Sequence, residues 1–180
     1  MRCHWRSGSI AVAEPTQRIA EITLDERTVV RRSPEIERER AAAIADLVEA
    51  NHFSPASGLD GPFRVHLATS EGRLAMEVTA VGDARRETIA LSLRPFARII
   101  KDYFLVCDGY AKAVRDGNLA QVEAIDMGRR GLHDEGAMLL LDRLAGKIAL
   151  DHATARRLFT LICVLHLKAA AHGFGPHPRP

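Results

Sequence analysis

The stretch from Leu158 to Leu167 (LFTLICVLHL) constrains the fold most, because Thr160 and His166 are its only polar residues. Leu158 and Leu161 begin an apolar stripe at helical spacing, and apolar residues also fill the remaining faces. A helix of this kind is stable only when it is covered on nearly every side. The stretch is far shorter than the roughly twenty apolar residues that span a bilayer. We therefore predict a buried helix at the centre of the molecule.

Alternating and helical patterns divide the rest of the chain into short strands and amphipathic helices. The predicted strands lie near residues 20–24, 63–67, 74–78, 89–93 and 148–150. The predicted helices run from Pro34 to about Asn51, from Pro95 to the stop at Gly117, from the Asn118 cap to Leu144, and from Asp151 through the buried stretch. Segregated strands and helices favour an α+β fold: an antiparallel sheet of three to five strands, with about four helices layered on one face around the buried C-terminal helix.

Two further segments are assigned by their local chemistry. Residues 54–62 (SPASGLDGP) are turn formers throughout and are predicted to form a loop. Ser33, Pro34 and Glu35 are a strong helix start, and the charges between Glu35 and Arg40 are expected to lie mostly on the solvated side of that helix.

We expect one globular domain over residues 15–168. Residues 1–14 (MRCHWRSGSIAVAE) have no sustained period and no apolar run of signal-peptide length, so we predict a disordered extension. An over-called start would explain the same residues. Residues 169–180 are rich in Gly, Pro and His and are predicted to be a disordered tail.

Charge and cysteine usage bear on partners and compartment. A net charge of +2, from 25 basic and 23 acidic residues, gives no strong field that would draw the chain to nucleic acid or anionic lipid. Cys3 lies in the irregular N-terminal segment, whereas Cys107 and Cys163 lie in helical patterns. This usage indicates reduced, buried thiols and a cytoplasmic protein. No membrane association is expected, because the longest apolar run is too short to span a bilayer.

The segment IDMGRRGLHDEG (125–136) breaks local rules, because each of its three glycines costs a helix interior on the order of 1 kcal/mol relative to Ala. If the helix continues through it, residues at three- and four-residue spacing share one face. An arginine there could bind a phosphate or carboxylate, and the histidine could carry a proton. The candidate anion- or ligand-binding residues are Asp126, Arg129, Arg130, His133 and Asp134.

The competing interpretation of this segment is structural. Its charges would form a surface salt-bridge ladder, and Gly128 and Gly131 would face another helix, namely the long one from Phe96 to Val114. A break of the helix at the glycines remains a further alternative.

Motifs for cofactors, metals and nucleophiles are absent from the sequence. No GxSxG, P-loop, GxGxxG, HExxH or paired-cysteine motif occurs, so we expect no cofactor and no metal. His133 and Glu135 are two residues apart, which does not place them on one helix face. Cys107 and Cys163 lie on apolar helices, where thiolate formation is disfavoured.

Basic residues could in principle reach nucleic-acid phosphates. They are Arg27, Arg31 and Arg32 before the first helix, and the pairs 85–86, 129–130 and 156–157. The polar faces of the predicted strands carry no aromatic residue on which bases could stack. We therefore interpret these arginines as solvated ends of helices and hairpins and do not expect nucleic-acid binding.

Four blocks carry a resemblance to a known family: PTQRIAEITLDERTVVRRSPEIERERAAAI, LSLRPFARIIKDYFLVCDGY, QVEAIDMGRRGLHDEGAMLL and DHATARRLFTLICVLH. Together they resemble uncharacterised protein family 0262, a group of small bacterial proteins. The resemblance covers roughly Pro15 to His166. It implies a small intracellular bacterial protein and no assigned activity or catalytic residues.

We expect a non-enzymatic cytoplasmic protein that binds a partner protein or a small anion and regulates another process, because a complete fold pattern accompanies no catalytic constellation. The alternative is an enzyme or binding protein for a phosphorylated or carboxylated metabolite that uses Arg129, Arg130 and His133. A second alternative is RNA binding through the arginine pairs. The sequence leaves the oligomeric state open.

Overall fold

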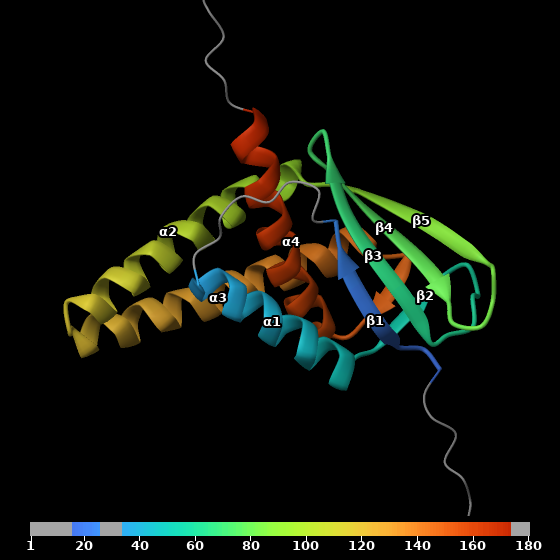
Figure 1. The fold of residues 1–180 in the computed structure, drawn as a ribbon, viewed down its shortest axis with the longest axis horizontal. Coiled ribbons are helices and arrows are strands. Elements are labelled where there is room, and N and C mark those ends of the chain that lie inside the picture. Colours follow the sequence, from blue (N-terminus) through green and yellow to red (C-terminus); the bar gives the residue numbers. More distant parts are fainter. Residues whose placement is uncertain (1–15, 26–33, 174–180) are drawn as a thin grey trace, which may run out of the picture.

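The computed structural model describes residues 16–25 and 34–173, which form an α+β fold as predicted. A four-stranded sheet lies on one side of the molecule, and its strand order is β1-β3-β4-β5. Helices cover one face of the sheet (Figure 1). The strands of this sheet are β1 Ile19–Leu24, β3 Phe63–Ser70, β4 Arg73–Ala80 and β5 Arg86–Ser92.

The sheet is mixed, so the prediction of a purely antiparallel sheet is wrong in one strand. β3, β4 and β5 form the predicted antiparallel meander. β1 pairs parallel to β3, with Ile22 opposite Val65 and Leu24 opposite Leu67. The physical reason is the connection, since the chain passes through a helix between β1 and β3 and re-enters in the same direction. Alternation of side chains has the same period in either direction.

A second, two-stranded sheet pairs β2 Phe53–Pro55 antiparallel with β6 Ile148–Leu150. The strand at β6 was predicted, whereas the start of the predicted loop is the short strand β2. Three residues that end in proline give no periodic signal. The pairing is fixed by a segment that lies far away in the sequence.

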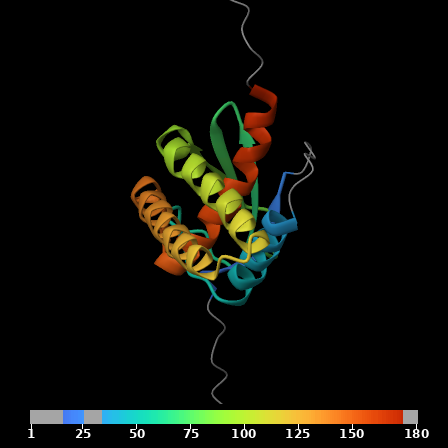
Figure 2. The same ribbon diagram turned by 90° about the vertical axis from the view of Figure 1, so that its left-hand side faces the viewer.

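The helices are α1 Pro34–Glu49, α2 Ala97–Arg115, α3 Leu119–Leu144 and α4 His152–Gly173, and a short 3₁₀ turn, η1 Arg94–Phe96, precedes α2. Within the described residues no helix is both long and apolar enough to cross a membrane. α2 and α3 form an antiparallel hairpin that packs against α4 and crosses it at a steep angle (Figure 2).

The centre of the molecule is α4, as predicted. Its residues from Leu158 to Leu165 are all at most 5% exposed. α4 stands between the sheet and the other helices (Figure 1). The helix begins with Asp151 as its cap, because the Oδ1 atom of Asp151 accepts a hydrogen bond of 2.8 Å from the backbone N–H of Thr154. It continues to Gly173, five residues into the segment predicted to be a tail.

α3 is one continuous helix, so the alternative of a break at its glycines does not hold. The Asn118 side chain caps it as predicted, by accepting a hydrogen bond from the N–H of Gln121. The prediction that Gly128 and Gly131 face α2 is wrong, because a Cβ atom at either position would meet no atom within 4 Å. Gly136 is the closely packed glycine, and a Cβ atom there would overlap the ring of Phe159 in α4.

Several predictions fall on residues outside the described ranges. The Ser33 cap, Cys3 and the cluster Arg27, Arg31 and Arg32 are among them.

Candidate functional site

A cavity of about 450 Å³ lies between α1, α3 and α4. α1 lines it with Glu39 and Asp46, and two alanines of the same helix leave the space between these carboxylates open. α3 contributes Arg129 and His133. α4 contributes Thr160 and four residues of its first two turns, which are His152, Ala153, Arg156 and Arg157. The volume suits a small-molecule ligand, since such sites run from about 300 to 1,000 Å³.

Of the five predicted site residues, the structure brings Arg129 and His133 to the cavity wall. Asp126 lies behind Arg129 and accepts its hydrogen bonds, with an Nη2 to Oδ1 distance of 2.8 Å. The hydrogen bond from Arg129 lowers the pKa of the Asp126 carboxyl below its usual range. Arg130 pairs with the other oxygen of Asp126 at 2.7 Å, but its side chain is 68% exposed and does not line the cavity.

Arg129 also joins α3 to α1 and α2. Its guanidinium donates a hydrogen bond to Glu39, and the other carboxylate oxygen of Glu39 accepts one from the hydroxyl of Tyr103. The Glu39 side chain is only 23% exposed, so the prediction of a mostly solvated charge run is wrong at this position. The reason is that Glu39 faces two donors from neighbouring helices. This network fixes the guanidinium of Arg129 at the edge of the cavity.

His133 is buried between α3 and α4 and is only 9% exposed. Its Nδ1 atom lies 3.3 Å from the hydroxyl of Thr160, and that hydroxyl donates to the backbone carbonyl of Arg156 at 3.3 Å. Because Thr160 has a single proton to donate, we infer that Nδ1 carries the ring proton and donates it to Thr160. The Nε2 atom then holds a lone pair, and it is buried without a hydrogen-bond partner.

Burial also sets the charge of this histidine. It lowers the pKa of His133 from the ordinary 6.5 to about 4, against the attraction of Glu39. The ring of Tyr103 lies 5.2 Å away and that of Phe159 lies 6.2 Å away, both edge to face. At neutral pH the imidazole is therefore uncharged and held in one orientation.

α4 begins at the cavity and places basic side chains beside its positive end. The N–H groups of Thr154 and Ala155 are bound by the cap residue Asp151. Among the described residues, the N–H groups of His152 and Ala153 have no acceptor. These two groups lie where the helix macrodipole favours an anion.

Arg156 and Arg157 near this helix start each make a polar contact but do not use all of their N–H donors. The Nη1 atom of Arg156 lies 3.3 Å from Asp134, which also lies 4.0 Å from His152. Asp134, the fifth predicted site residue, does not line the cavity but holds the side chain of Arg156 at its wall. Arg157 donates to the carbonyl of Ala50 at 3.0 Å.

Chemically, the arrangement is suited to hold an anion. No group of three side chains in the described part of the chain could hold a metal ion. Cys107 and Cys163 are free thiols, and burial raises the pKa of Cys107 to about 11 and that of Cys163 well above its ordinary value. Neither thiol is a nucleophile at neutral pH.

Comparison with known proteins gives the family. The sequence profile of the uncharacterised protein family UPF0262 matches residues 16–168. The chain belongs to this family. This UPF0262 chain is 55% identical over 153 residues to a UPF0262 protein of Rhodospirillum rubrum, covering 85% of this chain and 94% of the relative.

Other bacterial UPF0262 proteins are similar over the same extent. A relative from Rhodopseudomonas palustris is 51% identical over 155 residues, which is 86% of this chain and 95% of the relative. A relative from Caulobacter vibrioides is 51% identical over 154 residues, which is 86% of this chain and 96% of the relative. No solved structure matches the chain significantly. The relatives carry only the family name, so the function of this UPF0262 chain has to be argued from the site.

Sequence reasoning on this UPF0262 chain missed the α1 and α4 sides of the cavity. In the sequence Arg156 and Arg157 resemble solvated helix-end charges, although basic residues in the first two turns of a helix oppose the usual dipole preference. This departure from the usual charge pattern is the sequence signal for the α4 side of the cavity. Glu39 gave no signal, because it stands in a run of alternating charges that looks solvated throughout.

Proposed function

We propose that this protein is a non-enzymatic binding protein that holds a small anionic ligand, bearing a phosphate or carboxylate group, in the cavity between α1, α3 and α4. The observation that carries the proposal is the start of α4 at the cavity, where two free backbone N–H groups and the side chains of Arg156 and Arg157 converge. A helix start with adjacent guanidinium groups is a strong arrangement for binding phosphate and carboxylate.

The guanidinium of Arg156 supports the proposal because it has donors to spare. It uses only Nη1 on Asp134, and no acceptor among the described residues takes its Nε or Nη2 protons. Arg157 contacts Asp46 only loosely, with an Nε to Oδ2 distance of 3.8 Å. An incoming anion can therefore be bound without breaking a short ion pair.

Binding is favoured over catalysis by the state of the groups at the cavity. A general acid or base works best with a pKa near the operating pH, and the pKa of His133 is about 4. A neutral imidazole with one lone pair can accept a hydrogen bond from a ligand hydroxyl or amine. The enzyme alternative remains the rival proposal for the same cavity.

RNA binding through the arginine pairs has less support. Arg129 is held by two carboxylates, and Arg156 and Arg157 each face one. Among the described residues no phenylalanine or tyrosine side chain is exposed, so the bases of a single strand would have no stacking surface of this kind.

We further propose that the protein works in the cytoplasm. The support is the state of its cysteines, since both are free thiols in helices, Cys163 buried and Cys107 partly buried. Reducing compartments maintain thiols in this form.

A thermal-shift experiment tests the proposed function. The full chain is melted with phosphate, pyrophosphate, sugar phosphates, nucleotides and dicarboxylates. At a ligand concentration of about 100 Kd, binding stabilises the folded state by about 2.7 kcal/mol. For a chain of this size the melting temperature then rises by about 5–10 °C. We expect a dose-dependent rise with one of these classes.

Variants locate the effect. Arg156→Gln and Arg157→Gln are expected to remove the ligand-induced rise, because they remove guanidinium donors at the helix start. Arg64→Gln is the matched control, since Arg64 is an exposed sheet residue paired with Glu21. Arg130→Gln is expected to retain the rise, because its side chain lies outside the cavity. A rise that survives in Arg156→Gln and Arg157→Gln, or no rise with any anion class, would sink the proposal.

A further inference from the structure

A second cavity of about 450 Å³ lies near the other end of α4. It forms where the β3–β4 turn, the end of β5 and the start of α2 meet the side chain of His166. It shares no lining residue with the cavity between α1, α3 and α4. Along α4, His166 lies ten residues beyond Arg156, which is about 15 Å of helix. The two cavities are therefore separate sites.

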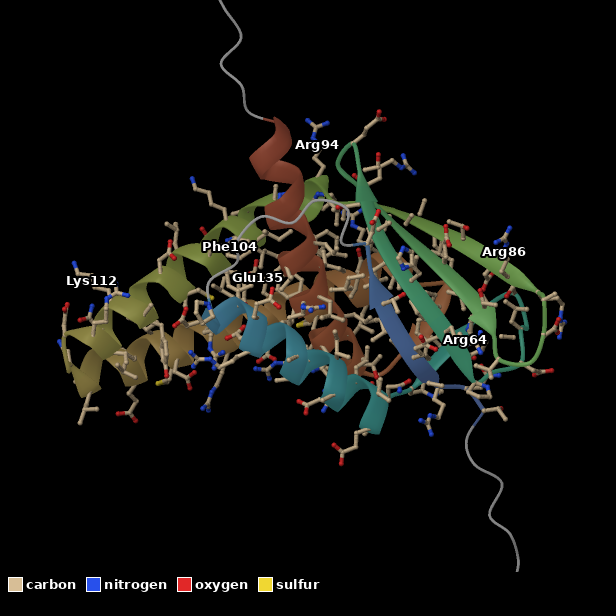
Figure 3. All side chains as sticks on the ribbon, in the orientation of Figure 1. Arg64, Arg86, Arg94, Phe104, Lys112 and Glu135 are labelled. Atoms are coloured by element: carbon tan, nitrogen blue, oxygen red, sulfur yellow. The ribbon has the colours of Figure 1, made fainter. Side chains whose placement is uncertain are left out.

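Arginines without ion-pair partners line this second cavity. Arg73 at the start of β4 and Arg94 in η1 are both exposed, and among the described residues neither has a carboxylate within 4.0 Å. Arg94 projects beside the end of the β3–β4 hairpin, close to α4 (Figure 3). Glu71 is the one acidic residue among those that line the cavity. This differs from the first cavity, where each arginine faces a carboxylate or a carbonyl.

The start of α2 adds to the positive potential. Neither Leu93 nor Phe96 offers a side-chain cap, and the first turn of α2 contains no acidic residue. The N–H groups of Arg94, Phe96 and Ala97 are already paired within the chain, so only the helix dipole favours an anion here. Arg94 is the basic residue of η1, directly before α2. An anion in the cavity would neutralise an otherwise unfavourable arrangement.

Two polar side chains complete the wall. His166 lines the cavity, and its Nδ1 atom is buried and has no hydrogen-bond partner. The hydroxyl oxygen of Ser92 accepts a long hydrogen bond of 3.4 Å from the N–H of Arg94, which leaves its proton available to a ligand. Two guanidinium groups and a hydroxyl are donors that phosphate groups use in proteins.

We propose that this cavity is a second binding site, which takes the phosphate-type oxyanion of a small molecule. Arg73 and Arg94 form the charge clamp, the dipole of α2 favours the anion, and the hydroxyl of Ser92 orients it. The inference is independent of the ligand that occupies the first cavity.

Equilibrium dialysis with radiolabelled pyrophosphate at physiological salt tests the proposal, with the full chain as the protein. The unmodified chain is expected to bind two pyrophosphates. Arg73→Gln/Arg94→Gln is expected to retain one, with a loss of affinity of about tenfold or more at the other. Arg156→Gln/Arg157→Gln is expected to lose the site in the first cavity and to retain the site in the second. Arg64→Gln is the control that keeps both, and near-ultraviolet circular dichroism checks that each variant is folded.

The outcomes separate the two proposals. Unchanged stoichiometry and affinity in folded Arg73→Gln/Arg94→Gln overturn the second site, whatever happens at the first. A single site that is lost only in Arg73→Gln/Arg94→Gln supports the second site and leaves only the carboxylate form of the proposed function. A single site that is lost only in Arg156→Gln/Arg157→Gln supports the proposed function and overturns the second site. No binding at millimolar pyrophosphate overturns the second site.

Discussion

Gly136 of α3 lies directly against the ring of Phe159 of α4, with no room for a Cβ atom between the helix backbone and the ring. The ring cannot move away easily, because the ring of Phe96 stacks on it at a centroid distance of 6.3 Å and that of His133 lies 6.2 Å away. α3 and α4 therefore approach each other most closely where this glycine stands. The contact explains one of the three glycines in the segment 125–136.

The first prediction is that the glycines of α3 respond to alanine with opposite signs. Gly136→Ala forces the Phe159 ring to shift, and overpacking of this kind costs about 1–3 kcal/mol of unfolding free energy. Gly128→Ala and Gly131→Ala meet open space and gain helix propensity, so each should stabilise by about 0.5–1 kcal/mol. Urea unfolding of the three variants measures these differences. A destabilised Gly128→Ala or Gly131→Ala would mean that α3 contacts something at that face.

The glycines also illustrate what the sequence could supply. Gly136 stands four and eight residues before the buried Leu140 and Leu144, so helical phase alone places it on the packed face. Gly128 and Gly131 do not share that phase and lie on the exposed face. A phase argument applied to each glycine separately would have chosen the right one.

Strand direction and partner choice could not be predicted in this way. The alternation of β1 fits parallel and antiparallel pairing equally well, so its direction depends on the path of the chain through α1. The cavity combines α1 with residues about ninety positions later in the chain, such as the pair of Glu39 and Arg129. Local periodicity carries no information on such contacts, whereas it was sufficient for α4.

The second prediction concerns the core helix. Leu161 and Ile162 are at most 1% exposed, so replacing either by alanine leaves a cavity that costs about 2–5 kcal/mol. Leu105→Ala is the matched control, because its side chain is 61% exposed and its replacement should change stability by no more than about 0.5 kcal/mol. Chemical unfolding compares the three. A Leu161→Ala protein as stable as Leu105→Ala would contradict the central position of α4.

The third prediction is a pH dependence that belongs to His133. Its pKa is about 4 in the folded chain and 6.5 is the ordinary value, so below pH 6.5 the unfolded chain takes up a proton that the folded chain refuses. This contribution to stability is present at neutral pH and is lost as the pH falls from 6.5 towards 4. By pH 5 the loss is about 2 kcal/mol.

His133→Gln isolates the contribution of His133 to the pH dependence of stability, because glutamine does not titrate and can still donate to Thr160. Unfolding free energies at pH 7 and pH 5 should differ less in the variant than in the unmodified chain, by about 2 kcal/mol. Equal pH dependence in the two proteins would show that His133 titrates normally and is not shielded as the structure indicates.

The fourth prediction tests the network between α1, α2 and α3. Arg129→Met leaves the largely buried Glu39 without its cation and should cost about 1–3 kcal/mol. Glu39→Gln/Arg129→Met removes both charges, and its cost should be smaller than the sum of the two single changes. A double-mutant cycle measured by urea unfolding gives the coupling. Additive losses would mean that the pair contributes nothing beyond its separate side chains.

The most direct test of the proposed anion site is a nuclear magnetic resonance titration of the ¹⁵N-labelled chain with pyrophosphate. We predict saturable shifts of the backbone N–H groups of His152 and Ala153 and of the Nε–H groups of Arg156 and Arg157, with no comparable change at the control Arg64. Unshifted resonances at all four positions, or equal shifts at Arg64, would contradict the claim that the start of α4 binds an anion.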